Sequence, residues 1–80
     1  MEILLDVCKV QPLPDFQLLL EFENSEKRTF DMKPLLQTKP FNRLKDPLMF
    51  SRAKIDYGTV VWPGNIDIAP ETLYEDSIPC

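Results

Sequence analysis

The most regular run in the sequence is Phe16-Gln17-Leu18-Leu19-Leu20-Glu21-Phe22-Glu23. Every second side chain from Phe16 to Phe22 is large and apolar, and three of the four residues that alternate with them are polar. Successive side chains of a β-strand point to opposite faces of the sheet. The alternation therefore predicts a strand with one buried face, formed by Phe16, Leu18, Leu20 and Phe22.

Strands are also predicted on both sides of this run. Residues 2–11 are rich in aliphatic side chains, and Cys8 is expected there as a small core residue. The turn Pro12-Leu13-Pro14-Asp15 follows, because each proline fixes its φ angle. After a loop at residues 24–26, residues 27–32 return as a third strand. Short loops between consecutive strands predict an antiparallel meander.

Prolines change the pattern after residue 32. Asp31 and Asp46 each precede a proline at a suitable first helical position, which favours short helical turns at residues 33–36 and 47–52. A third short turn is expected at residues 41–45. The apolar residues expected to be buried in this region are Phe41, Leu44, Leu48 and Phe50.

Short strands resume after the helical turns. Residues 53–57 and 59–62 flank Gly58, and a brief extended segment follows at residues 66–68. The expected apolar anchors are Ile55, Tyr57, Val60 and Trp62. A last helical turn begins at Pro70.

This order predicts an α+β fold with a small curved antiparallel sheet, made of a β-meander, short helical turns and further short strands. Residues 1–75 are expected as a single domain and residues 76–80 as a loose C-terminal tail.

Composition makes several classes of function unlikely. The chain has 80 residues, no histidine and two cysteines, so it lacks a disulfide scaffold and the commonest metal ligand and general base. Asp56, Asp67 and Glu71 are the only acids that suggest a carboxylate cluster, and their spacing matches no recognised motif. We therefore expect no enzyme activity, no cofactor and no metal, and hence no catalytic, cofactor-binding or metal-ligating residues.

The location of the protein is expected to be cytoplasmic. No apolar run approaches the roughly 18–20 residues that span a bilayer. The first six residues contain two acids and no base, unlike a signal peptide. We expect no membrane partner.

Charge is distributed unevenly along the chain. Residues 1–23 carry a net charge of −4, residues 24–54 of +5 and residues 55–80 of −5. One interpretation is that the basic middle folds against the acidic ends, so that the charges neutralise one another. The other is that one of these segments binds a partner of opposite charge.

Four segments resemble the bacterial domain of unknown function 2442 family. They are residues 12–16, 31–36, 41–47 and above all 61–74, which read Val-Trp-Pro-Gly-Asn-Ile-Asp-Ile-Ala-Pro-Glu-Thr-Leu-Tyr. The resemblance runs from about Val7 to Tyr74. The usual family turn is Trp-Pro-Asn-Gly, whereas residues 62–65 read Trp-Pro-Gly-Asn, which is expected to alter the turn type and not the fold.

The resemblance implies a short α+β domain, in some members followed by a helix-turn-helix DNA-binding domain. Many members are encoded beside a second small protein, a layout that has suggested toxin–antitoxin pairs. Together with the composition, this favours a small non-catalytic protein-interaction domain, antitoxin-like, that binds a protein partner or self-associates through a sheet edge. The candidate contact residues are Arg43, Lys45, Arg52, Trp62, Asp67, Glu71, Tyr74 and Glu75.

Each candidate has a structural alternative. Trp62 and Tyr74 are typical core aromatics, and Asp67 is typical of a turn or helix cap. The alternative function is a nucleic-acid-binding accessory domain that uses the basic segment 39–54, where bases alternate with Phe41 and Phe50 as in a single-strand groove.

Overall fold

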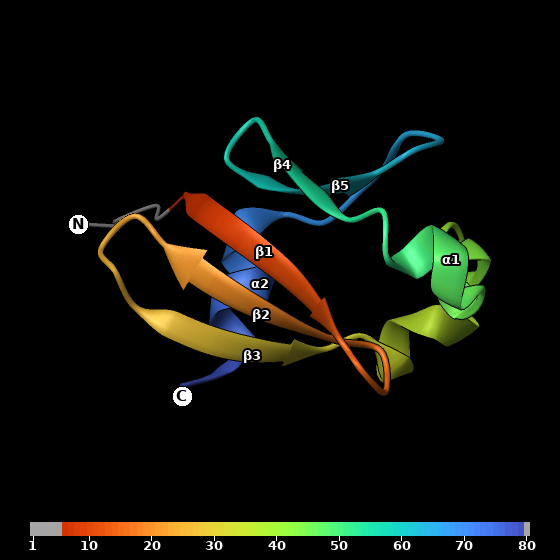
Figure 1. The fold of residues 1–80 in the computed structure, drawn as a ribbon, viewed down its shortest axis with the longest axis horizontal. Helices are drawn as coiled ribbons and strands as arrows, with labels where there is room; N and C mark the ends of the chain where they lie inside the picture. The colour runs from red at the N-terminus through yellow and green to blue at the C-terminus, as the bar shows by residue number, and fades with distance from the viewer. Residues whose placement is uncertain (1–5, 80) are drawn as a thin grey trace.

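The structure is a computed structural model that describes residues 6–79 (Figure 1). Its strands and helices are, in chain order, β1 (Val7–Leu13), β2 (Gln17–Phe22), β3 (Lys27–Asp31), the 3-10 helices η1 (Lys33–Gln37) and η2 (Phe41–Lys45), α1 (Pro47–Phe50), β4 (Lys54–Asp56), β5 (Thr59–Trp62), β6 (Ile66–Asp67), α2 (Pro70–Glu75) and β7 (Ile78–Pro79). The predicted α+β class is confirmed.

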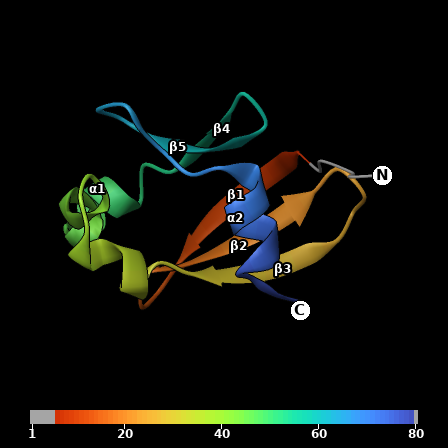
Figure 2. The same ribbon diagram turned by 180° about the vertical axis from the view of Figure 1, so that it is seen from behind.

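The strands of the described chain form two antiparallel sheets. The main sheet has the order β1-β2-β3-β7, and the small sheet has the order β4-β5-β6. The small sheet lies beside β1, and α2 covers the face of the main sheet that is turned away from the viewer in Figure 1 and toward the viewer in Figure 2. The backbone N–H of Val7 donates to the carbonyl of Gly58 at 2.9 Å and so connects the two sheets.

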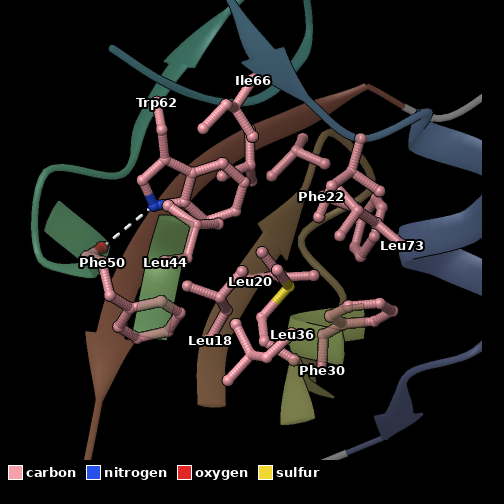
Figure 3. Packing of buried hydrophobic residues seen from close by; sticks show 14 residues of the cluster. Leu18, Leu20, Phe22, Phe30, Leu36, Leu44, Phe50, Trp62, Ile66 and Leu73 are labelled. Atoms are coloured by element: carbon pink, nitrogen blue, oxygen red, sulfur yellow. Dashed lines mark hydrogen bonds between the residues drawn. The ribbon is translucent and has the colours of Figure 1, made fainter. Parts of the chain in front are cut away.

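The apolar face predicted for the second strand is confirmed. Leu18, Leu20 and Phe22 are buried on the inner face of β2, and Phe16 is half-buried just before it. Trp62 and Leu73 reach the same core from β5 and α2 (Figure 3). The burial of these side chains is the main stabilising contribution in a domain of this size.

The predicted helix cap is confirmed at α1, where a side-chain oxygen of Asp46 accepts a hydrogen bond from the backbone N–H of Leu48 at 3.0 Å. The 3-10 helices differ, since their N-caps, Met32 of η1 and Pro40 of η2, make no side-chain cap hydrogen bond. Asp31 accepts a hydrogen bond from the backbone N–H of Lys33 at 2.9 Å but precedes the N-cap of η1. The prediction that Leu48 is buried is wrong, since its side chain is 76% exposed. Helix α1 is a single turn, and it turns Phe50, not Leu48, into the core.

Two further burial predictions are corrected. Cys8 is exposed, because the pairing of β1 with β2 shifts register between Val7 and Lys9 and takes Cys8 out of the alternation. Tyr57 is 93% exposed, because it lies in the turn between β4 and β5 and not in a strand. The start of the first predicted strand, residues 2–5, lies outside the described residues.

The C-terminal segment differs from the expected loose tail. Ser77 is buried, and residues 78–79 form β7, whose partners on β3 are Arg28 and Thr29. Cys80 lies outside the described residues. No helix within residues 6–79 has both the length and the apolar character that a membrane span requires.

Candidate functional site

Trp62, one of the predicted contact residues, is a core residue. Its side chain is 2% exposed, and its indole N–H donates to the carbonyl of Phe50 at 3.0 Å (Figure 3). Its ring also stacks on that of Phe50 with centroids 6.3 Å apart. The structural alternative is therefore the correct one for Trp62, and no partner reaches its side chain in this conformation.

Tyr74 also has a structural place. Its hydroxyl donates to the carboxylate of Glu26 at 2.9 Å, and its ring packs edge-on against Phe22 with centroids 5.1 Å apart. The guanidinium of Arg28 lies 4.5 Å from the centre of the same ring. Tyr74 thus ties α2 to the main sheet.

Arg28 completes this network, which we call the C-terminal latch and define as Glu26, Arg28, Tyr74 and Ser77. The guanidinium donates to the Ser77 hydroxyl at 2.6 Å and to the Ser77 carbonyl at 2.8 Å, and it forms an ion pair with Glu26. Arg28 and, to a lesser extent, Tyr74 lower the pKa of Glu26. The hydrogen bond to Glu26 is the main cause that raises the pKa of Tyr74.

The predicted basic contact residues are all exposed. With two neighbours they form what we call the basic end, which comprises Lys39, Arg43, Lys45, Arg52 and Lys54. The segment that carries them runs from η1 to β4 and includes the end of the molecule at the right of Figure 1.

The basic end is not neutralised within the described chain. The ion pairs of residues 6–79 join Arg28 to Glu26 and Lys33 to Asp15 and Asp31, and none involves a member of the basic end. The interpretation that the basic middle is neutralised by the acidic ends is therefore correct for Lys33, which pairs with Asp15 of the N-terminal segment. It is not correct for the five side chains of the basic end. Exposed cations without an ion-pair partner attract acidic ligands.

The predicted acidic contact residues lie on two elements. Asp67 is exposed on β6, and Glu71 and Glu75 are exposed on α2, four residues apart and so on one helix face. Within residues 6–79 the carboxylate of Asp67 makes no hydrogen bond that would fit the expected turn or cap role. None of the three carboxylates forms an ion pair there.

The outer face of the small sheet contains a shallow hollow of about 380 Å³, which we call the small-sheet hollow. Val61 lies at its centre, and its register partners Lys54 and Asp67 stand on either side. Tyr57 borders the hollow at one end of β5, and the loop at residues 63–65 borders the other. The inner face of the same sheet is covered by the core.

The loop at residues 63–65 explains how the exchanged Gly-Asn order is accommodated. Gly64 and Asn65 both have positive φ angles, of 94° and 64°. Glycine and asparagine are the residues that tolerate this conformation best, so either order fits the loop. The guanidinium of Arg43 lies next to Gly64, 3.4 Å from the position that a Cβ atom would take.

Tyr57 is the residue of this surface that sequence reasoning missed. It pairs with Gly58 in a two-residue turn between Asp56 and Thr59, and both turn residues have positive φ angles, of 53° and 73°. Such turns favour Asn-Gly or Asp-Gly, and an ordinary residue in the left-handed region costs roughly 1–2 kcal/mol. The sequence signal for this turn is the Tyr-Gly pair between two strand-like segments. The same pair also fits the end of a strand, so it does not identify the turn.

The acids considered as a carboxylate cluster are separated. Asp56 and Asp67 both line the small-sheet hollow, whereas Glu71 does not. Within the described part of the chain, no three His, Cys, Asp or Glu side chains are grouped so that they hold a metal ion.

Comparison with known proteins identifies the family but not an activity. Residues 7–79 match the family model described as "Protein of unknown function (DUF2442)". No curated protein and no solved structure matches the chain. Since the family match covers almost all of the sequence, including the Trp-Pro turn and the segment up to α2, the chain belongs to the DUF2442 family.

Proposed function

We propose that this chain is a non-catalytic protein-interaction domain and that its contact surface is the outer face of the small sheet. The observation that carries the proposal is Tyr57, a fully exposed aromatic side chain at a turn position that disfavours it. Exposed aromatic side chains are typical anchors of protein interfaces. The presence of a residue that reduces the stability of the fold is accounted for if that residue contributes to binding.

The shape of the surface favours a protein over a small molecule. The hollow has the volume of a small ligand pocket, but Tyr57 at its border is 93% exposed and does not enclose it. Small-molecule sites usually bury about 70–90% of their ligand. A broad, open surface with an aromatic residue at one end suits a protein face better.

The proposal includes the antitoxin-like role in a two-gene pair, for which the support is the resemblance to the family. For a basic partner of that kind we propose a second contact surface on α2, formed by Glu71 and Glu75, because both are exposed and neither is in an ion pair within residues 6–79.

The test is the substitution Tyr57→Asn, which separates binding from stability. Asparagine suits the turn, so we expect the free energy of unfolding to rise by about 0.5–1 kcal/mol. Loss of the aromatic anchor is expected to weaken partner binding at least about tenfold. Urea unfolding measures the first quantity, and capture by the tagged chain from nuclease-treated lysate of its native cell measures the second.

Leu48→Asn provides the matched control, because Leu48 is also a large exposed apolar residue but does not line the hollow. A protein retained by the parent and by Leu48→Asn but lost from Tyr57→Asn supports the proposed surface. Equal retention by all three contradicts it. Capture of a small protein in an amount equimolar with the tagged chain, together with its loss from the double variant Glu71→Lys/Glu75→Lys, supports the antitoxin-like role.

A second candidate function is nucleic-acid binding by the basic end, and the lack of ion pairs at its five side chains within residues 6–79 favours it. The triple substitution of Arg43, Lys45 and Arg52 by alanine is expected to weaken binding to a labelled single-stranded oligonucleotide at low salt. Each lost phosphate contact reduces the salt slope by about 0.7, so the slope is expected to fall by about 2. Fluorescence anisotropy measures both quantities.

Lys9 and Lys27, which are exposed on the main sheet, provide the control pair for this experiment. Their replacement by alanine is expected to leave binding within about threefold of the parent, as these residues lie on β1 and β3 and not in the segment 39–54. If the parent chain does not bind the oligonucleotide at low salt, this candidate function is excluded.

A further inference from the structure

The small-sheet hollow has a charge pattern that is complementary to itself. Lys54 on β4 pairs in register with Val61 on β5, and Val61 pairs with Asp67 on β6. Because neighbouring strands are about 4.8 Å apart, one positive and one negative side chain flank Val61 at a separation of roughly 10 Å. Neither side chain takes part in an ion pair within residues 6–79.

We propose that a second copy of this chain docks on the hollow, related by a two-fold axis that runs along β5. Rotation by 180° about this line exchanges the positions of β4 and β6 across the interface. Lys54 of each copy then faces Asp67 of the other, and Val61 faces Val61. The inference rests on the proposed function, since it identifies the protein that the surface binds.

Charge selects this axis over the perpendicular one. A two-fold axis across the strands in the same plane would place Lys54 against Lys54 and Asp67 against Asp67, which is repulsive. The axis along β5 gives two ion pairs around a central apolar contact. In each pair the lysine comes from one copy and the aspartate from the other.

The same axis gives Tyr57 a partner. Rotation about β5 preserves position along the strand, so the tyrosines of the two copies meet at the turn end of the interface. Asp56, also exposed on this face, then lies opposite the segment Ile68–Ala69, which is bonded beside Thr59 and Val60 and carries no charge. Among Lys54, Asp56 and Asp67, no pair of like charges is brought together.

The outer face of the main sheet does not have this property. Its corresponding row is Lys9, Glu21 and Lys27, which are register partners across β1, β2 and β3. A two-fold axis along β2 would place Lys9 of one copy against Lys27 of the other. The main sheet therefore disfavours face-to-face pairing, and the small sheet is the face that fits a second copy.

The dimer is expected to be weak. Ten residues line the hollow, whereas a stable interface uses about 20–30 residues on each side. We expect the dissociation constant to increase with salt concentration, because the ion pairs are screened.

Sedimentation velocity over a wide range of protein concentration tests the proposal with two charge reversals. Lys54→Glu and Asp67→Lys each place like charges together twice, so each variant alone is expected to dimerise at least about tenfold more weakly than the parent. An equimolar mixture of the two is expected to dimerise like the parent. In the mixed dimer the introduced glutamate of one copy faces the introduced lysine of the other, and the remaining Asp67 faces the remaining Lys54.

Lys9→Glu is the matched control, since it makes the same charge change on the main sheet and should leave the dimer unchanged. Thermal unfolding of every variant verifies that it is folded. A parent that stays monomeric at the highest concentration, or a mixture that does not recover, overturns the inference. If the parent stays monomeric but still captures a different protein through Tyr57, the proposed function stands without the dimer; if the parent stays monomeric and Tyr57→Asn captures as much protein as the parent, both fail.

Discussion

Replacement of Trp62 by alanine is expected to destabilise the domain by about 3–5 kcal/mol, the usual effect of removing a large aromatic side chain from a core. Trp62 is 2% exposed, and the deletion leaves a cavity between Phe50 and the rest of the core. Domains of this size have a total stability of roughly 4–12 kcal/mol. We therefore expect Tm to fall by roughly 15–30 °C, or the chain to unfold at room temperature.

The substitution Trp62→Phe distinguishes the contribution of the aromatic ring to stability from that of the indole hydrogen bond. Phenylalanine retains an aromatic ring but no N–H, and the Phe50 carbonyl still accepts from the backbone N–H of Ala53 at 3.3 Å. A smaller loss of about 1–2 kcal/mol is therefore expected. Trp62 is the only tryptophan in the chain, so far-UV circular dichroism and not fluorescence is the appropriate measurement.

The control for both variants is Leu48→Ala, at an exposed position where a change within about 0.5 kcal/mol is expected. If Trp62→Ala is as stable as the parent, then Trp62 is not part of the core and becomes a contact residue again. Trp62→Phe is expected to retain whatever partner binding the parent shows, because its side chain stays inside.

Features that depend on neighbouring residues were predictable from the sequence. The alternation from Phe16 to Phe22 predicted the buried face of β2, and the order Asp46-Pro47 predicted the start of α1. In both cases the physical cause lies within a few residues: the pleat of a strand in the first, and a side-chain cap with a fixed φ angle in the second.

Features that depend on distant contacts were not predictable. The bulge that exposes Cys8 is defined by the pairing of β1 with β2, and the placement of β7 depends on hydrogen bonds between Arg28 and Ser77, 49 residues apart. The division of the strands into two sheets belongs to the same class. Sequence periodicity contains no information about which strands pair.

The candidate site was predicted in part. Arg43, Lys45 and Arg52 are exposed as predicted, and their role in binding stays a prediction. Trp62 and Tyr74 were named as contact residues because large aromatics occur both in cores and at interfaces. Only the packing around each ring distinguishes the two cases.

The second large effect is expected at the C-terminal latch. Arg28→Met retains the length of the side chain but removes both hydrogen bonds to Ser77 and the ion pair with Glu26. Hydrogen bonds to charged groups contribute about 1.5–3 kcal/mol, so we expect a loss of about 2–3 kcal/mol. Arg28→Lys is expected to be intermediate, because a lysine has the charge but not the planar fork.

The loss is expected to be local before it is global. The latch holds α2 and β7, whereas β1 and β2 are paired independently of it. Hydrogen exchange should therefore show a larger loss of protection at the amides of Leu73 in α2 and of its C-cap Asp76 than at the β2 amides. An equal loss at both sites would mean that the latch does not act as a separate unit.

The pH dependence of the latch tests the roles of its two titrating groups. The pKa of Glu26 is lowered from its ordinary value of 4.5, so its contribution to stability is present above that pH and is lost as the pH falls through the lowered value. The pKa of Tyr74 is raised from 10.0, so its contribution is present below pH 10.0 and is lost as the pH rises through the raised value.

Protection of the α2 amides should thus decrease at both extremes of pH in the parent. Glu26→Gln is expected to remove the decrease at low pH, because glutamine cannot be protonated in that range. It should also shift the alkaline decrease toward pH 10, because the carboxylate that holds the Tyr74 proton is gone. If Glu26→Gln follows the parent at both ends, the acid and alkaline losses arise elsewhere and the latch does not control them.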